Sequence, residues 1–422
     1  MAAPCPEGDS GAVISLSPGA ATRLVSATFR HRCKEPHVHT RPLSAALVLL
    51  LAACSAAPEP EPTPPPAPAA AQREPDELAE TDPLLSEAGL AHATIAEAFV
   101  SAATPEDNVD SPAAWRGPDG RTWVIATAKE GKAGLIVYDG DSGERLRGVG
   151  GTGDGEGEFL RPNGIAVAGD RLLVVERDNR RVQVLALPGF ETLASFGRDQ
   201  LRRPYGVWVR APGADTLDVL VTDAYMAGED EHGDEIVPPL AELDRRVQRY
   251  RVRFGDGGAT VEHLGHFGAV SAADAIRIPE SLWGDEVHDR LLIAEEDIRV
   301  GTALREYTLD GQSRGRTHGL GLFRAQAEGI ALWACPDGSG YWLATDQFKD
   351  RSLFHVFDRR SLEHLGAFAG ETTANTDGVW LHQAGTGRFP KGVFYAVHDD
   401  MALAAFDWRD IAAALGLRED CG

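Results

Sequence analysis

Short apolar runs recur along the chain from about residue 107 to residue 406, separated by turns rich in Gly, Asp and Pro. Such runs are too short for helices and predict buried strands. One helical pattern, Asp410–Leu417, closes the chain. The runs predicted as strands are Trp123–Thr127, Gly134–Tyr138, Gly164–Val167, Leu172–Glu176, Val182–Leu187, Gly206–Val209, Val219–Thr222, Val247–Val252, Leu291–Ala294, Gly329–Trp333, Tyr341–Thr345, Leu353–Phe357, Gly378–Leu381, Gly392–Val397 and Ala402–Phe406.

An internal repeat selects one architecture among the all-β folds. Gly150–Leu187 contains a Gly-rich turn, the sequence Pro-Asn-Gly-Ile-Ala-Val, a strand that ends in an acid, and a further strand. This segment resembles one repeat of the NHL type, a four-stranded propeller blade. The same rhythm returns around Gly206, Gly329 and Gly378. At roughly 40–50 residues per blade, the remaining length predicts an all-β, six-bladed β-propeller.

The N-terminal part of the chain has a different composition and carries an export signal. An apolar stretch, Leu43–Ala53, follows basic residues and ends Leu-Ala-Ala-Cys. It is too short to span a membrane as a stable helix and is typical of a secretory signal peptide. The ending resembles the lipobox of bacterial lipoproteins, which implies cleavage before Cys54 and lipidation of its thiol. An ordinary signal peptide with a chance cysteine is the alternative.

We therefore divide the chain into four parts. Residues 1–53 form the signal peptide region, of which 1–40 reflect a start site assigned too far upstream. Residues 54–73 are the lipidated Cys54 and a disordered Pro/Ala-rich tether. Residues 74–106 form a partly helical lead-in segment, and residues 107–422 form the propeller domain. The expected location is the bacterial cell envelope, outer membrane or periplasmic face, with the membrane contacted through the lipid anchor.

Charge and cysteine content narrow the function. The formal net charge of the 422 residues is -23, and no basic stripe is present, so nucleic acid is excluded as a partner. An acidic chain is compatible with binding divalent cations. After export, Cys335 and Cys421 remain, and an oxidising compartment permits a disulfide between them. We expect a monomer.

Acidic residues stand at or beside the starts of the predicted inner strands. They are Glu280, Glu328, Asp377 and Asp110, and Glu295 follows the strand Leu291–Ala294. Inner strands of a propeller line its central channel, so these carboxylates should converge on one mouth and suit calcium. Strand alternation would place Glu295 and Asp297 on one face and Glu296 on the other. The alternative is that the acids only cap β-turns.

The order of these motifs resembles that of the β-propeller phytases, the calcium-dependent hydrolases of inositol polyphosphates (3-phytase type). The strongest similarity lies in Glu280 followed by Arg-Leu-Leu-Ile-Ala-Glu-Glu-Asp297, in Ala327-Glu-Gly-Ile, and in Asn375-Thr-Asp-Gly-Val. The N-terminal blades match more loosely, through Asp110-Ser-Pro-Ala-Ala-Trp and the segment Ala128–Tyr138.

The resemblance implies a phosphoric monoester hydrolase whose substrate is phytate or another small phosphoester. Metal-activated water would attack phosphorus. The residue roles that follow are catalysis by Glu280, Glu328 and Asp377; Ca²⁺ binding by Glu280, Glu295, Glu328, Asp377 and Asp110; and phosphate binding by Lys129, Arg180 (or Arg181) and Tyr205.

Three departures from the family pattern keep other functions open. Ser111 replaces the second acid of a paired Asp-Asp, Thr222–Tyr225 replaces a Lys-bearing segment, and an acidic insert, Gly228–Glu235, follows. A non-catalytic NHL-like propeller lipoprotein that binds a protein or a glycan is the main alternative. A metal-dependent lactonase propeller ranks last.

Overall fold

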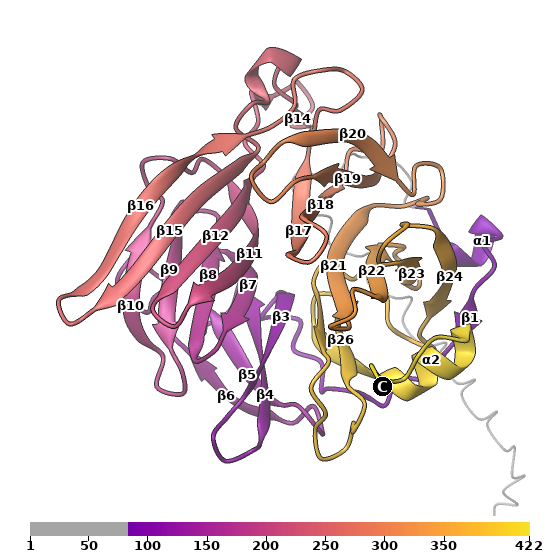
Figure 1. Ribbon diagram of the computed structural model, residues 1–422. Coiled ribbons are helices and arrows are strands. Elements are labelled where there is room, and N and C mark those ends of the chain that lie inside the picture. Colours follow the sequence, from indigo (N-terminus) through magenta and orange to yellow (C-terminus); the bar gives the residue numbers. More distant parts are fainter. Residues whose placement is uncertain (1–82) are drawn as a thin grey trace, which may run out of the picture. The chain divides into compact units, whose positions relative to one another are not determined.

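The computed structural model describes residues 83–422, which belong to one compact unit of the chain (Figure 1). The signal peptide, Cys54 and the Pro/Ala-rich tether lie outside the described residues. Among residues 83–422, no helix is both long enough and apolar enough to cross a membrane.

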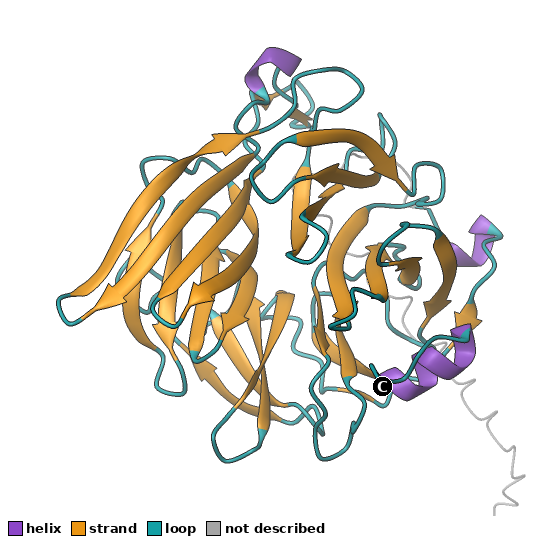
Figure 2. Cartoon of the chain, in the orientation of Figure 1, coloured by secondary structure: helices purple, strands orange, loops and turns teal. Residues whose placement is uncertain are grey.

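The six-bladed propeller predicted from the sequence is confirmed. Nearly all regular structure is strand (Figure 2), and the strands form six antiparallel sheets whose inner strands contact one another in sequence order. The first three blades are β3(Val109–Arg116) to β6(Arg145–Val149) with β4(Thr122–Ala128) and β5(Leu135–Asp139); β7(Pro162–Ala168) to β10(Glu191–Phe196) with β8(Arg171–Glu176) and β9(Arg181–Ala186); and β11(Pro204–Gly213), β12(Thr216–Asp223), β15(Val247–Gly255) and β16(Gly258–Phe267).

The last three blades follow the same plan. They are β17(Pro279–Asp285), β18(Arg290–Glu295), β19(Ala303–Tyr307) and β20(Ser313–His318); β21(Ala327–Ala334), β22(Gly340–Asp346), β23(Leu353–Asp358) and β24(His364–Ala369); and β25(Val379–His382), β26(Val393–His398) and β27(Ala402–Asp407). The third blade also carries a small hairpin, β13(Gly228–Glu229) and β14(Glu235–Ile236), and a 3-10 turn, Leu240–Glu242.

The ring is closed by the segment that precedes the first blade. β2(Phe99–Val100) pairs antiparallel with β27 and supplies the fourth strand of the last blade. β1(Ala93–Thr94) pairs parallel with β24 as a fifth strand of the fifth blade. Within the described part of the predicted lead-in, residues 83–106, the helix is one turn, α1(Leu85–Ala88), and β1 and β2 pair at the edges of two blades.

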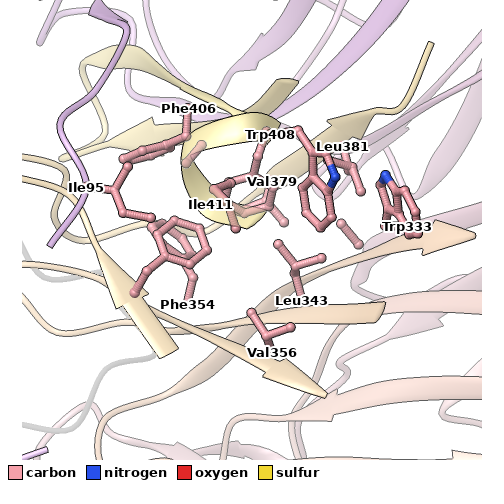
Figure 3. Packing of buried hydrophobic residues seen from close by; sticks show 14 of the residues in the cluster. Ile95, Trp333, Leu343, Phe354, Val356, Val379, Leu381, Phe406, Trp408 and Ile411 are labelled. Atoms are coloured by element: carbon pink, nitrogen blue, oxygen red, sulfur yellow. The ribbon is translucent and has the colours of Figure 1, made fainter. Parts of the chain in front are cut away.

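Apolar side chains fill the space between neighbouring blades. The largest cluster joins the fifth and sixth blades and packs Ile95 of the closing segment against Phe354 and Phe406 (Figure 3). Trp408 of α2(Trp408–Leu415) stacks on Trp333, with ring centroids 5.2 Å apart. The permitted disulfide is present: Cys335 and Cys421 are bonded, with their Cα atoms 5.3 Å apart.

Candidate functional site

One backbone irregularity recurs at the start of the inner strands. In the first five blades the register of the inner strand shifts by a bulge just after its first residue. A bulge re-aims the side chains it contains. The bulged position, or in the sixth blade the second residue before β25, is occupied by Asp110, Asn163, Tyr205, Glu280, Glu328 and Asp377. We call these six residues the ring.

Small residues follow the ring positions because the blades touch there. A Cβ on Gly378 would lie 2.5 Å from Ser111 Cα, and one on Gly329 would lie 2.7 Å from the Asp377 carbonyl oxygen. Hydrogen bonds join the same strands: Gly378 N–H donates to the Asp110 carbonyl at 3.0 Å, and Gly329 N–H donates to Asp377 at 2.9 Å. The ring is therefore rigidly spaced.

The second strand of each blade ends beside the ring position of the same blade. In blades two to five its last residue is an acid whose carboxylate accepts N–H groups of the segment leading into the inner strand. These bonds are Glu176 with Leu160, Asp223 with Arg202 and Arg203, Glu295 with Arg277 and Ile278, and Asp346 with Arg324 and Ala325. This acid is structural.

The next residue along the chain then lies at the mouth. Its N–H donates to the carbonyl two residues before the ring position, at 2.8–3.0 Å in the first five blades. The residues at these positions, which we call the outer ring, are Lys129, Arg177, Ala224, Glu296 and Gln347. Side chains from two tiers thus surround one mouth.

Three carboxylates meet on the side of blades four and five. Oxygen atoms of Glu280, Glu296 and Glu328 all lie within 4.8 Å of one another, and the three residues are buried. Burial, together with the Glu328 and Glu296 charges, raises the pKa of Glu280 well above its ordinary value. Burial and the Glu296 charge likewise raise the pKa of Glu328. Gln326 donates to Glu296 at 2.7 Å. A divalent cation would relieve this repulsion.

A buried lysine bridges the acids of blades one and six. Lys129 Nζ lies 3.2 Å from Asp110 Oδ2 and 3.2 Å from Asp377 Oδ2. Burial alone would lower the pKa of Lys129, but the Asp377 and Asp110 carboxylates raise it by more, so the net pKa lies well above its ordinary value and the amine stays protonated. Asp110 also accepts from Tyr205 Oη at 3.2 Å and from Asn163 Nδ2 at 3.3 Å. These contacts fix four ring members relative to one another.

Amide side chains extend this network on the side of blades five and six. Gln347 donates to Asp377, and Asn375 Nδ2 donates to Asp400 Oδ2 at 3.0 Å. Lys349 Nζ donates to Asn375 Oδ1 at 2.6 Å. Burial and the Asp377 charge raise the pKa of Asp400 to about 8. Asp400 is therefore a further acid of the site.

A basic cavity adjoins the ring between blades one and two. It measures about 300 Å³, and its charged lining consists of three bases, Lys129, Arg161 and Arg177, and two acids, Glu130 and Asp178; Arg177 Nε donates to Asp178 Oδ1 at 2.8 Å. Burial and the Arg177 charge lower the pKa of Arg161, and Tyr205 lies close enough to oppose that effect. The central channel itself is narrow, a cavity of about 50 Å³ whose lining includes Trp283 and Trp380. An anion would therefore enter from the basic side of the mouth.

The structure brings together most of the residues singled out in the sequence. Asp110, Glu280, Glu328 and Asp377 converge, and Lys129 and Tyr205 lie among them. Two residues lie elsewhere. Glu295 is the structural acid of its blade, with its carboxylate turned to backbone N–H groups. Arg180 is exposed in the β8–β9 turn, and Arg181 is buried against Glu176.

Residues at the mouth that the sequence analysis did not assign to the site include Glu296, Asp400, Arg161 and Arg177. As alternation predicts, Glu295 and Glu296 face different surroundings, but Glu296 and not Glu295 joins the carboxylates at the mouth, directly after β18 ends. The repeat held the necessary signal. In four blades the acid that ends the second strand accepts backbone N–H groups, so the side chain of the next residue is the one that lies at the mouth.

Comparison with known proteins gives one family model that matches part of the chain. The family model described as Phytase matches residues 274–406, which contain Glu280, Glu296, Glu328, Asp377 and Asp400. No curated protein matches the chain in sequence.

Many solved structures resemble the chain at low identity. They include the Kuenenia stuttgartiensis hydrazine synthase (12% identity, TM-score 0.42, 76% of this chain and 85% of that chain) and the Myceliophteria thermophila Cps50 (Swd1) β-propeller domain (9%, 0.41, 70% and 96%). Another is a nidogen/laminin complex (13%, 0.35, 66% and 82%). These values support no statement about function.

Proposed function

We propose that this propeller, whose six blades and match to the Phytase model support a place in the β-propeller phytase family, is a calcium-dependent phosphomonoesterase. The observation that carries the proposal is the buried group of Glu280, Glu296 and Glu328 beside a basic cavity. Inositol polyphosphates such as phytate are the proposed substrate class.

The residues fit a hard divalent cation. Carboxylate oxygens are the ligands that calcium prefers, and the three buried carboxylates lie within 4.8 Å of one another, where their charges repel. Glu280, Glu296 and Glu328 would hold the ion. Asp377, Asp110 and Asp400 would be the ligands of any further calcium ions. When bound, calcium supplies Lewis-acid polarisation of a phosphoryl oxygen and a more acidic water.

The other side chains of the mouth act on the phosphate. Arg161 and Arg177 face the cavity and would bind non-bridging oxygens by charge-assisted hydrogen bonds. Lys129 holds Asp110 and Asp377 in place. Burial and the Asp110 charge raise the pKa of Tyr205 well above its ordinary value, so its hydroxyl keeps its proton and serves as a donor.

The test is phosphate release from phytate and from p-nitrophenyl phosphate by the purified chain, with calcium and then with chelator. We expect release that requires calcium and is reduced at least 100-fold by Glu328→Gln. The matched control is Glu363→Gln, an exposed acid in the β23–β24 turn. A folded chain that releases no phosphate from either compound would favour the non-catalytic alternative, a propeller that binds a protein or a glycan.

Lipid anchoring through Cys54 also remains a proposal, supported by the Leu-Ala-Ala-Cys sequence. In a bacterial host, wild-type chain should incorporate labelled palmitate and fractionate with membranes. Cys54→Ala should do neither while keeping the propeller intact.

A further inference from the structure

The turn between β8 and β9 places a carboxylate in the basic cavity. Asp178 lines this cavity together with Arg161 and Arg177. The turn is closed by the Arg180 N–H, which donates to the Arg177 carbonyl at 3.2 Å. Asp178 directly follows an outer-ring residue and belongs to neither ring.

The place of this carboxylate is set by the fold, because the turn is anchored on both sides. Asn179 is buried, and its amide donates to the Gly153 carbonyl at 2.9 Å and to Glu176, the structural acid of the blade. Arg177 N–H donates to the Arg161 carbonyl at 3.0 Å. The residues before and after the carboxylate are therefore fixed relative to the cavity.

The Asp178 carboxylate holds one particular donor of Arg177. Arg177 Nε donates to Asp178 Oδ1 at 2.8 Å, and the Arg177 side chain is only 16% exposed. A guanidinium can bind an oxyanion side-on, through Nε and one Nη group, or end-on, through both Nη groups. Because Asp178 takes Nε, the end-on pair is the one left for a phosphate in the cavity.

The same carboxylate is a counter-charge for the two guanidinium groups that line the cavity. Burial and the Arg177 charge lower the pKa of Arg161, whereas the Asp178 charge raises it. Two like charges that line one cavity repel each other, and an acid close to both reduces that repulsion. Asp178 therefore favours the presence of both arginines at the cavity before a phosphate binds.

We infer that Asp178 is a positioning residue for phosphate binding, which holds Arg177 Nε and so presents both Nη groups of Arg177 to the phosphate. This inference rests on the proposed phosphomonoesterase function, in which Arg177 binds non-bridging oxygens. A side chain that is already ordered loses less conformational entropy when a ligand binds, which for one arginine corresponds to about 2- to 10-fold in affinity.

Two substitutions separate the hydrogen bond from the charge. Asp178→Asn and Asp178→Ala remove the same negative charge, but only Asn keeps an oxygen that can accept from Arg177 Nε. In calorimetric titration of the calcium-loaded chain with inorganic phosphate, the Ala variant should bind about 2- to 10-fold more weakly than the Asn variant. KM for p-nitrophenyl phosphate should be higher for Ala than for Asn, with a smaller difference in kcat.

A second comparison tests whether Asp178 acts through Arg177. In an Arg177→Met background, the difference between the Asn and Ala variants should disappear, which a purely structural role of the turn would not predict. Asp119→Asn and Asp119→Ala are the matched control pair and should bind phosphate alike. Arg121 Nε donates to Asp119 Oδ2 at 2.7 Å, but this pair lies in the β3–β4 turn, at the end of β3 away from the ring.

The outcomes separate this inference from the function it rests on. If wild-type chain binds phosphate with calcium and the two Asp178 variants bind it equally well, only the positioning role is refuted. A difference that persists in the Arg177→Met background would also refute it. If the calcium-loaded wild type binds no phosphate and hydrolyses neither ester, both inferences fail. Should Asp178→Ala not fold, Asp178→Gly, which suits a turn, replaces it, and phosphate affinity equal to that of Asp178→Asn would refute the role in the same way.

Discussion

Two neighbouring glutamates give the sharpest test of the site. Glu296 belongs to the buried carboxylate group, whereas Glu295 accepts the N–H groups of Arg277, Ile278 and Asp297 at 2.8, 2.9 and 3.3 Å. Replacing either by Gln makes the same change at adjacent positions: one carboxylate oxygen becomes an amide NH2 group, and the charge is lost. Glu296→Gln should therefore weaken calcium binding, and Glu295→Gln should weaken the fold.

The size of each effect follows from linkage. Calcium at about 100 times its Kd stabilises the folded state by about 2.7 kcal/mol. Unfolding the roughly 340 described residues has an entropy of about 0.7 kcal/mol/K, so calcium should raise the Tm by about 4 °C. If Glu296→Gln weakens binding about 10-fold, the same calcium raises the Tm by about 2 °C. Losing hydrogen bonds to a charged acceptor in Glu295→Gln should cost about 2–3 kcal/mol.

Thermal unfolding, followed by tryptophan fluorescence with calcium and with chelator, measures both quantities. Glu295→Gln should melt about 3–4 °C below wild type in chelator and keep the full increment with calcium. Glu296→Gln should melt no lower than wild type in chelator and lose at least half of the increment. The reverse pattern, with the increment lost in Glu295→Gln and kept in Glu296→Gln, would refute the assignment of the two glutamates.

Three further predictions concern stability and specificity. Burial raises the pKa of Glu97, but hydrogen bonds from residues 371–373 lower it to about 2. The ionised carboxylate therefore stabilises the folded state above about pH 4.5, and this stabilisation is lost as the pH falls towards 2. After a discount for solvent screening, the free energy of unfolding in urea should fall between pH 6 and pH 3 by about 1–2 kcal/mol more for wild type than for Glu97→Gln. Cys421→Ser removes the disulfide to Cys335, which closes a loop with a sequence separation of 86. The free energy of unfolding in urea should fall by about 4–5 kcal/mol, because the unfolded chain gains the entropy of the open loop. An unchanged free energy of unfolding would contradict this loop-entropy argument. Glu235→Gln removes the negative charge paired with Arg203. At low salt it should raise the ratio of kcat/KM for phytate to kcat/KM for p-nitrophenyl phosphate several-fold, because phytate carries more negative charge. If this ratio did not change with salt concentration, the cause would not be electrostatic.

Much of the fold could be predicted from the sequence because each blade repeats one local pattern. Apolar runs, Gly at the close approach between inner strands, and an acid at the end of the second strand are all fixed by local physics, so they appear in the sequence. The closing strands could not be found in this way, because β1 and β2 are two residues long and form only against β24 and β27.

The site could be predicted only in part, for a similar reason. The inner-strand acids Glu280, Glu328 and Asp377 stand next to Gly or Ser, which marks them in the sequence. Glu296 follows the acid that ends β18, so its place can be found only by comparing the ends of the second strands across the blades and not from the local pattern of three adjacent acids. Asp400 lies in the connection between β26 and β27, where no strand pattern marks it.

The pairing of β2 with β27 also sets the order in which the protein can fold. Phe99 and Ala405 are partners in this ladder, so the last blade is built from chain segments about 300 residues apart. Closing so long a loop is slow and carries a large entropy cost, whereas the four antiparallel strands of each other blade come from neighbouring sequence. The blades emerging first can therefore form locally, but the mouth, whose ring spans the first and last blades, is assembled only when the two ends of the domain meet.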